Sequence, residues 1–194
     1  EDVDFDGEYV TELATGKQIS RSQIGNNVMC FSNAPLSASE AFSSPVSPPP
    51  FMVGMAEVEI DKETGVLELI DYVAVVDCGT VINPNLARVQ VEGGIAQGIG
   101  MALYEDVVYN EKGKNFSNSL MQYKIPTRLD VGTIRVEFES SYEPTGPFGA
   151  KSIGEIVINT PSPAISNAIQ NATGVIIREL PMTAEKIYRG ISGR

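Results

Sequence analysis

The stretch FMVGMAEVEIDKETGVLELIDYVAVV, residues 51–76, decides the fold. Towards residue 60 its apolar side chains alternate with glutamates, which is the pattern of a strand with one buried face. The segment DKETG (residues 61–65) has the composition of a tight turn, and residues 66–76 form a second run rich in β-forming residues. These features predict a β-hairpin.

Downstream of the hairpin, capping residues mark the start of each predicted helix. The helix starts are predicted at Asn83-Pro84, Thr160-Pro161 and Thr183, and Gly174 closes the second of these helices. Further strands are predicted at residues 107–109, 133–139 and 175–180. Because strands and helices do not alternate regularly, the predicted fold class is α+β, with mixed sheets packed with helices.

The first fifty residues differ in character from the rest of the chain. Residues 1–31 carry no convincing period, and residues 32–50 are rich in Ser, Ala and Pro and end in three prolines. Such a composition is typical of an extended connector. We therefore predict an N-terminal segment with its connector over residues 1–50, and a folded domain over residues 51–194.

The composition restricts the chemistry. The chain has 194 residues, 25 Asp+Glu against 14 Lys+Arg, and a net charge of −11, which argues against binding nucleic acid or an anionic membrane surface. There is no histidine, so a Ser-His-Asp triad, an imidazole zinc ligand and a histidine base are all excluded. Acid–base chemistry must use another side chain or a cofactor. The two distant cysteines, Cys30 and Cys78, fit a reducing, cytoplasmic setting.

The segment QVEGGIAQGIG, residues 90–100, combines helical apolar spacing with four glycines. Each glycine costs about 1 kcal/mol relative to alanine inside a helix, which is tolerated where something approaches the backbone closely. Gln90, Gly93, Gln97 and Gly100 share one helix face. This face suits a ligand rich in hydrogen-bonding groups, or it packs tightly on another element while the glutamines are solvated.

A second candidate is the loop GPFGAKSIGE, residues 146–155. Its glycines allow backbone N–H groups to converge on an oxyanion, and Lys151 adds positive charge. Glu155 has apolar neighbours in sequence, Ile153 and Ile156, so we expect an apolar site that raises its pKa and makes it a usable base. The alternatives are an ordinary turn, in which Glu155 caps a helix or pairs with Lys151, and an unrelated phosphate-binding loop.

From about residue 51 to residue 188 the chain resembles the C-terminal half of the molybdenum-binding (molybdopterin) subunit of the xanthine dehydrogenase/aldehyde oxidoreductase family, the molybdenum hydroxylases. The motifs that carry the resemblance are, in order, DCGTVINP (77–84), QVEGGIAQGIG (90–100), YKIPT (123–127), GAKSIGE (149–155), ATG (172–174) and RELP (178–181). One departure is Ile156-Val157, where many members have two prolines.

The resemblance implies a role for each candidate residue. Glu155 would be the general base, taking a proton from a hydroxyl on molybdenum so that its oxygen attacks an electron-poor carbon of the substrate. Gln90 would lie beside the metal and its pterin, and Gly93 would let the pterin approach. Gln97, Lys151 and Gly154 would be cofactor-side neighbours. The pterin dithiolene holds the metal in this family, so no direct protein ligand is expected.

The resemblance also implies an assembly. The domain would be half of a larger molybdenum-cofactor-binding domain, completed by a second molybdopterin-binding subunit or by the rest of a longer chain. The cofactor would be molybdopterin as its cytosine dinucleotide, with iron–sulfur clusters and FAD on partner subunits of a hetero-oligomer. The expected substrate is a purine- or nicotinate-like N-heteroaromatic. An aldehyde-oxidising member and a non-catalytic structural half remain alternatives.

Overall fold

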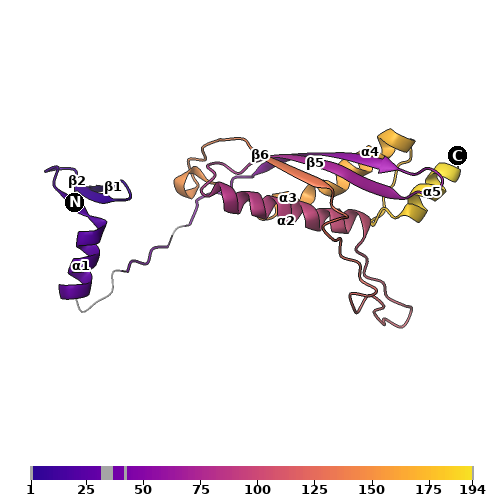
Figure 1. Ribbon diagram of the computed structural model, residues 1–194, viewed down its shortest axis with the longest axis horizontal. Helices are drawn as coiled ribbons and strands as arrows, with labels where there is room; N and C mark the ends of the chain where they lie inside the picture. Colours follow the sequence, from indigo (N-terminus) through magenta and orange to yellow (C-terminus); the bar gives the residue numbers. More distant parts are fainter. Residues whose placement is uncertain (1, 32–36, 42, 194) are drawn as a thin grey trace. The chain divides into compact units, whose positions relative to one another are not determined.

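The computed structural model describes residues 2–31, 37–41 and 43–193. The chain separates into two compact units, Glu1–Ser43 and Ser44–Arg194, and Figure 1 traces their elements. The candidate site residues all belong to the second unit.

The first unit is an antiparallel sheet followed by a helix. Its elements are β1 (Val3–Phe5), β2 (Tyr9–Glu12), β3 (Gln18–Ser20) and α1 (Arg21–Phe31), and the strand order is β1-β2-β3. The Asp6 carboxylate accepts hydrogen bonds from the N–H groups of Glu8 and Tyr9 and so closes the first turn. No residue of α1 is buried, which explains why the sequence of this unit shows no periodic pattern.

The sheet of the second unit is mixed, as predicted. Strands β4 (Phe51–Ile60) and β5 (Leu67–Asp77) pair antiparallel, with Phe51 opposite Asp77 and Ile60 opposite Leu67. This confirms the hairpin. Strand β6 (Thr133–Phe138) pairs with β5 in parallel, so the order is β4-β5-β6. Such a parallel neighbour requires a long crossover, which α2 and the following residues provide.

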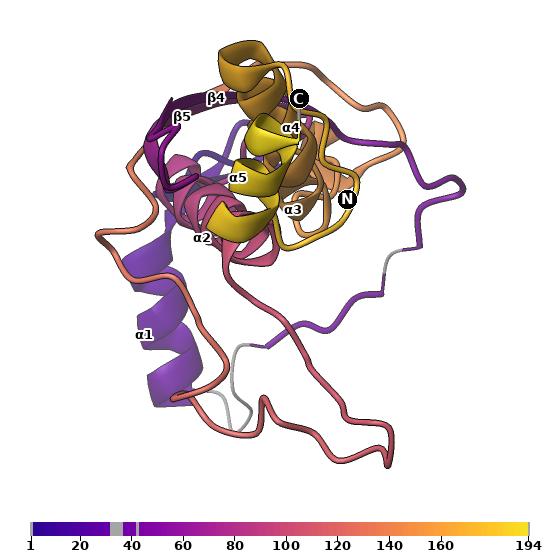
Figure 2. The ribbon, with the colours of Figure 1, turned by 90° about the vertical axis from the view of Figure 1, so that its right-hand side faces the viewer.

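The helices of this unit are α2 (Pro84–Leu103), α3 (Ile156–Asn159), α4 (Pro161–Thr173) and α5 (Ala184–Ser192), with a single 3₁₀ turn at Pro147–Gly149. Figure 2 shows α2, α3 and α5 on one side of strands β4 and β5. Two predicted caps are present: Asn83 Oδ1 accepts from the Leu86 N–H at 3.1 Å, and Thr183 Oγ1 accepts from the Lys186 N–H at 3.4 Å. Gly174 ends α4 in the left-handed conformation, at φ 72°.

The core lies between the sheet and these helices. It is built from fully buried side chains of β5, α2, α4 and α5: Tyr72, Val76, Val91, Ile95, Ile99, Ile165, Ile169 and Ile187. Tyr72 passes over Gly54 to donate its hydroxyl to Thr160 Oγ1 at 2.9 Å, and a Cβ at position 54 would lie 2.0 Å from that hydroxyl. The strand glycine is therefore needed for this contact. Burial raises the pKa of Tyr72.

Three local predictions are wrong in whole or in part. Helix α4 begins after Thr160, as predicted, but Thr160 makes no side-chain capping hydrogen bond: its backbone is already helical, at φ −85° and ψ −26°, and its hydroxyl accepts from Tyr72. Residues 175–180 form no strand: Val175 is buried and the Ile177 carbonyl accepts from Ser166 Oγ, so the apolar pattern reflects packing on the core. Residues 107–109 contribute only one isolated bridge, between Tyr109 and Asn115.

Among the described residues, no helix has the length and apolar character that crossing a membrane would require.

Candidate active site

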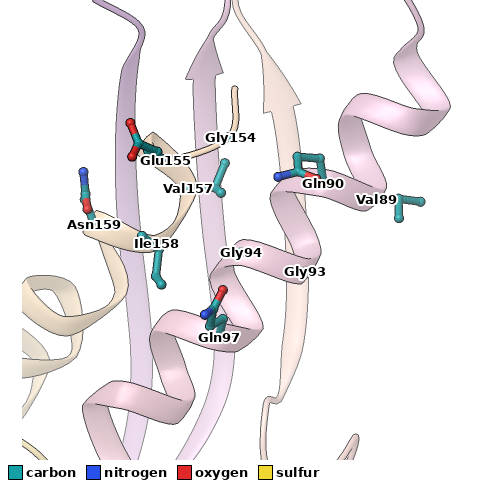
Figure 3. Close-up of a pocket in the computed structure, with 10 residues that line it drawn as sticks. All are labelled: Val89, Gln90, Gly93, Gly94, Gln97, Gly154, Glu155, Val157, Ile158 and Asn159. Carbon is teal, nitrogen blue, oxygen red and sulfur yellow. The ribbon is translucent and has the colours of Figure 1, made fainter. Parts of the chain in front are cut away.

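The two segments singled out in the sequence meet at one cavity of about 670 Å³ (Figure 3). Helix α2 forms one wall, and the end of the glycine loop with α3 forms the other. The lining residues are Val89, Gln90, Gly93, Gly94 and Gln97 from α2, and Gly154, Glu155, Val157, Ile158 and Asn159 from the facing segment. The structure thus brings together five of the six predicted site residues.

The glycines of α2 have two different functions. A Cβ atom at Gly93 would find no atom within 4 Å, so this position faces open space at the cavity. A Cβ at Gly94 would lie 2.1 Å from Val157 Cγ2, and one at Gly98 would lie 2.5 Å from Pro161 Cγ. Close packing is therefore confirmed at Gly94 and Gly98, which allow α3 and α4 to approach α2, while Gly93 faces the cavity and the ligand-binding interpretation of this face stays a prediction.

The polar groups of the cavity are primary amides and one carboxylate. Gln90 and Gln97 are exposed on α2, while their neighbour Val91 is fully buried in the core. Figure 3 shows these glutamines on α2 and shows Glu155 and Asn159 on the facing segment, at the start and end of α3. Amides both donate and accept hydrogen bonds, so this set recognises a ligand with mixed hydrogen-bonding groups.

Glu155 is exposed, and the predicted apolar environment is wrong for this chain by itself. Its sequence neighbours Ile153 and Ile156 pack against the core, while Glu155 itself is exposed. The ordinary-turn alternatives do not hold either. Glu155 makes no capping hydrogen bond to α3, and the partner of Lys151 is Asp77. Glu155 is therefore available to a ligand in the cavity.

Lys151 is the predicted site residue that does not line the cavity. Its ammonium lies 2.7 Å from Asp77 Oδ2 and 5.2 Å from the centre of the Phe51 ring. Asp77 also accepts hydrogen bonds from Ser141 Oγ at 2.6 Å and from the Gly79 N–H at 3.0 Å. The hydrogen bonds from Lys151, Ser141 and Gly79, in that order of importance, lower the pKa of Asp77 to about 2.

Sequence reasoning missed two parts of this arrangement. Asn159 stands four residues after Glu155, a helical spacing that would have placed it beside the carboxylate had α3 been recognised. The Asp77–Lys151 pair joins residues 74 positions apart, and one sequence contains no signal for such a contact.

Within the described ranges, no three acidic, cysteine or histidine side chains gather as a metal-binding group would.

The cavity thus presents Gly93 and two amides on α2, and the Glu155 carboxylate and the Asn159 amide on the facing segment. Comparisons with known proteins show the family to which the chain belongs. The sequence profile of the molybdopterin cofactor-binding domain matches residues 1–132, and the chain belongs to this family.

The relatives are oxidoreductases. The chain is 37% identical over 146 residues to the probable hypoxanthine oxidase of Escherichia coli K12, covering 73% of this chain and 15% of that protein. It is 36% identical over 141 residues to the aldehyde oxidoreductase of Megalodesulfovibrio gigas, covering 72% of this chain and 15% of that protein.

Among solved structures, quinoline 2-oxidoreductase from Pseudomonas putida 86 matches with a TM-score of 0.67 and 40% identity, over 71% of this chain and 18% of that one. The chain thus spans less than a fifth of the length of each of these relatives.

Proposed function

We propose that this chain is the part of a molybdenum hydroxylase that supplies the general base, Glu155, and one wall of the cofactor site. The observation that carries the proposal is the cavity, in which an available carboxylate faces a helix with amides and an exposed glycine. The overall reaction would be the oxidative hydroxylation of an electron-poor carbon with oxygen derived from water.

The residues present fit a molybdopterin cofactor. Open space beside Gly93 leaves room for a flat, bulky group against the α2 backbone. Gln90, Gln97 and Asn159 offer both donors and acceptors, which suits a pterin with its ring nitrogens, amino group and carbonyl. Gln90 and Gly93 would contact the cofactor, and Gln97 and Gly154 stay predicted neighbours. Lys151 is not proposed as a cofactor contact, because it pairs with Asp77 and does not line the cavity. The cytosine dinucleotide form is part of the same proposal.

When bound, the cofactor would supply the two-electron oxidation and the activation of the water-derived oxygen. The chain's own contribution is the proton transfer. Glu155 Oε would receive the proton as the oxygen nucleophile attacks the substrate carbon, a role that fits a carboxylate with no ion-pair partner among the residues that the structure describes. The amides of Gln90 and Gln97 would orient the groups facing α2. The remaining part of the enzyme would exclude water and complete the environment of Glu155.

The favoured substrate class is an N-heteroaromatic. Two of the relatives described above act on such rings according to their names, hypoxanthine oxidase and quinoline 2-oxidoreductase. The similarity to an aldehyde oxidoreductase supports an aldehyde as the second candidate. Partner subunits with iron–sulfur clusters and FAD would remove the electrons, in a cytoplasmic hetero-oligomer.

The test uses the complete molybdenum-containing enzyme. Its turnover is measured with hypoxanthine, nicotinate, quinoline and an aromatic aldehyde, in the parent and in Glu155→Gln, with the exposed Glu179→Gln as the matched control. We expect Glu155→Gln to keep its molybdenum and to lose at least about 10²-fold in turnover, while Glu179→Gln is unaffected. Turnover of Glu155→Gln within about threefold of the parent would exclude the base assignment. No turnover by the loaded parent would favour a structural half.

The assembly is tested on the same preparation. Enzyme purified from its natural source is analysed by native mass spectrometry, together with assays for molybdenum, iron, flavin and released cytidine monophosphate. Partner subunits with iron and flavin, and cytidine monophosphate in step with molybdenum, are the expected results. A preparation that carries molybdenum without iron or flavin would contradict the proposed electron path.

A further inference from the structure

The ion pair between Asp77 and Lys151 joins the two chain segments that lead into the walls of the cavity. Asp77 is the last residue of β5, and the chain continues from it through the Asn83 cap into α2, which carries Gln90. Lys151 stands four residues before Glu155. The two charged groups are 2.7 Å apart, so they connect the segment that presents Gln90 to the segment that presents Glu155.

The surroundings of the pair make it rigid. The Lys151 side chain is 8% exposed and the Asp77 side chain 22%, so water screens the pair little. Ser141 Oγ and the Gly79 N–H hold the second carboxylate oxygen, and the Phe51 ring lies under the ammonium. Because the carboxylate and the ammonium each contact further groups, the position of one relative to the other does not depend on the ion pair alone.

Backbone hydrogen bonds continue the same connection. The Lys151 N–H donates to the Cys78 carbonyl at 2.7 Å, and the Thr80 N–H donates to the Gly149 carbonyl at 2.8 Å. The two segments approach so closely that a Cβ atom at Gly79 would lie 2.3 Å from the Gly149 carbonyl oxygen. The ion pair therefore closes a short antiparallel contact between residues 78–80 and residues 149–151.

We propose that the Asp77–Lys151 pair is a positioning device, which fixes the loop that carries Glu155 relative to the helix that carries Gln90. This inference rests on the proposed function, because it gives the pair a role in the reaction through Glu155. Neither residue touches the cavity. Loss of the pair would leave the composition of the cavity unchanged but let Glu155 move, and a displacement of about 1 Å at a catalytic group can cost 10²-fold in rate.

The test compares four variants of the complete enzyme. Lys151→Met keeps the apolar stem over Phe51 and removes the charge, and Asp77→Asn keeps the shape and an acceptor. The double variant Asp77→Asn/Lys151→Met removes both charges, so that no unpaired charge remains. The control is Asp71→Asn, which removes the carboxylate of the Asp71–Arg135 pair on the same strand, away from the cavity. The measurements are kcat, KM, molybdenum content, thermal stability and deuterium exchange of the amides of residues 149–155.

Lys151→Met and Asp77→Asn are expected to lower kcat at least about tenfold, with KM changed less than about twofold. The amides of residues 149–155 should exchange faster, and molybdenum content should stay at the parent level. The double variant should regain thermal stability, because the unpaired charge is gone, while kcat stays low. Asp71→Asn should keep the parental kcat and exchange.

Two outcomes overturn the proposal. Recovery of kcat together with stability in the double variant would mean that the pair is only structural. If the amides of residues 149–155 exchanged deuterium at the parental rate in Lys151→Met, the pair would not hold the loop. This conclusion does not depend on whether Glu155 is the general base. The exchange measurement therefore separates this inference from the proposed function, which fails on its own if Glu155→Gln retains full turnover.

Discussion

The ring of Pro161 packs directly on Gly98: a Cβ atom at position 98 would lie 2.5 Å from Pro161 Cγ and 3.0 Å from the Ile158 carbonyl oxygen. Helix α2 therefore meets the junction of α3 and α4 at van der Waals distance. Because α3 follows Glu155 directly, this contact sets how far the carboxylate stands from α2.

Replacing this glycine should destabilise the fold. In Gly98→Ala the gain in helix propensity, about 1 kcal/mol, is opposed by overpacking against the Pro161 ring, which costs about 1–3 kcal/mol or more. We expect a lower free energy of unfolding, measured by urea denaturation followed by circular dichroism. A free energy equal to or above that of the parent would show that α4 moves away from α2 without cost.

Gly93→Ala is the matched substitution on the same helix, and we expect it not to lower the free energy of unfolding. No atom lies within 4 Å of the added methyl group, so helix propensity alone should act. The free energy of unfolding should stay the same or rise by up to about 1 kcal/mol. The methyl group enters the space assigned to the cofactor, so the molybdenum content of the complete enzyme should fall, as measured by metal analysis. Full molybdenum content with full activity would place the cofactor elsewhere.

The sequence was most informative where one residue type is required by a local rule. The alternation before Ile60, the Asn83 side chain before Pro84 and the left-handed Gly174 each determine an element from nearby residues alone, and the structure has all three. Local sequence also predicted part of the cavity wall. Gln90 and Gly93 lie on one helix face by periodicity, which requires no knowledge of the tertiary structure.

What the sequence could not predict depends on distant contacts. The Thr160 hydroxyl bonds to Tyr72 and makes no cap, and Ile153 and Ile156 pack against the core while Glu155 between them is exposed. In both cases the partner of the side chain lies far along the chain, where the local pattern carries no information. The strands of the first unit were missed for another reason: none of their residues is buried, so burial leaves no clear alternation in the sequence.

Gln90→Ala should change the surroundings of the metal in the complete enzyme. The Gln90 amide stands on the cavity wall, so its loss removes a hydrogen-bonding group that the proposal places beside the cofactor. We expect an altered molybdenum(V) electron paramagnetic resonance signal with molybdenum still bound. Gln170→Ala, which removes an exposed amide from α4, is the control and should leave the signal unchanged. An identical spectrum for Gln90→Ala, with full activity, would remove Gln90 from the site.

The Asp77 carboxylate should make part of the stability dependent on acid pH. Its pKa is lowered from 3.8 to about 2, above all by the hydrogen bond from Lys151, so the folded chain holds the charged form more strongly than the unfolded chain does. The resulting stabilisation, about 2 kcal/mol, is fully present above pH ~4 and is lost as the pH falls through 2.

Asp77→Asn should therefore be less stable than the parent near neutral pH, and the difference in unfolding free energy should shrink between pH 4 and pH 2, measured by urea denaturation at each pH. Glu179→Gln, in an exposed loop, is the control for a general effect of losing a carboxylate. If the difference between Asp77→Asn and the parent were constant from pH 7 to pH 2, the negative charge of Asp77 would not be what stabilises the fold.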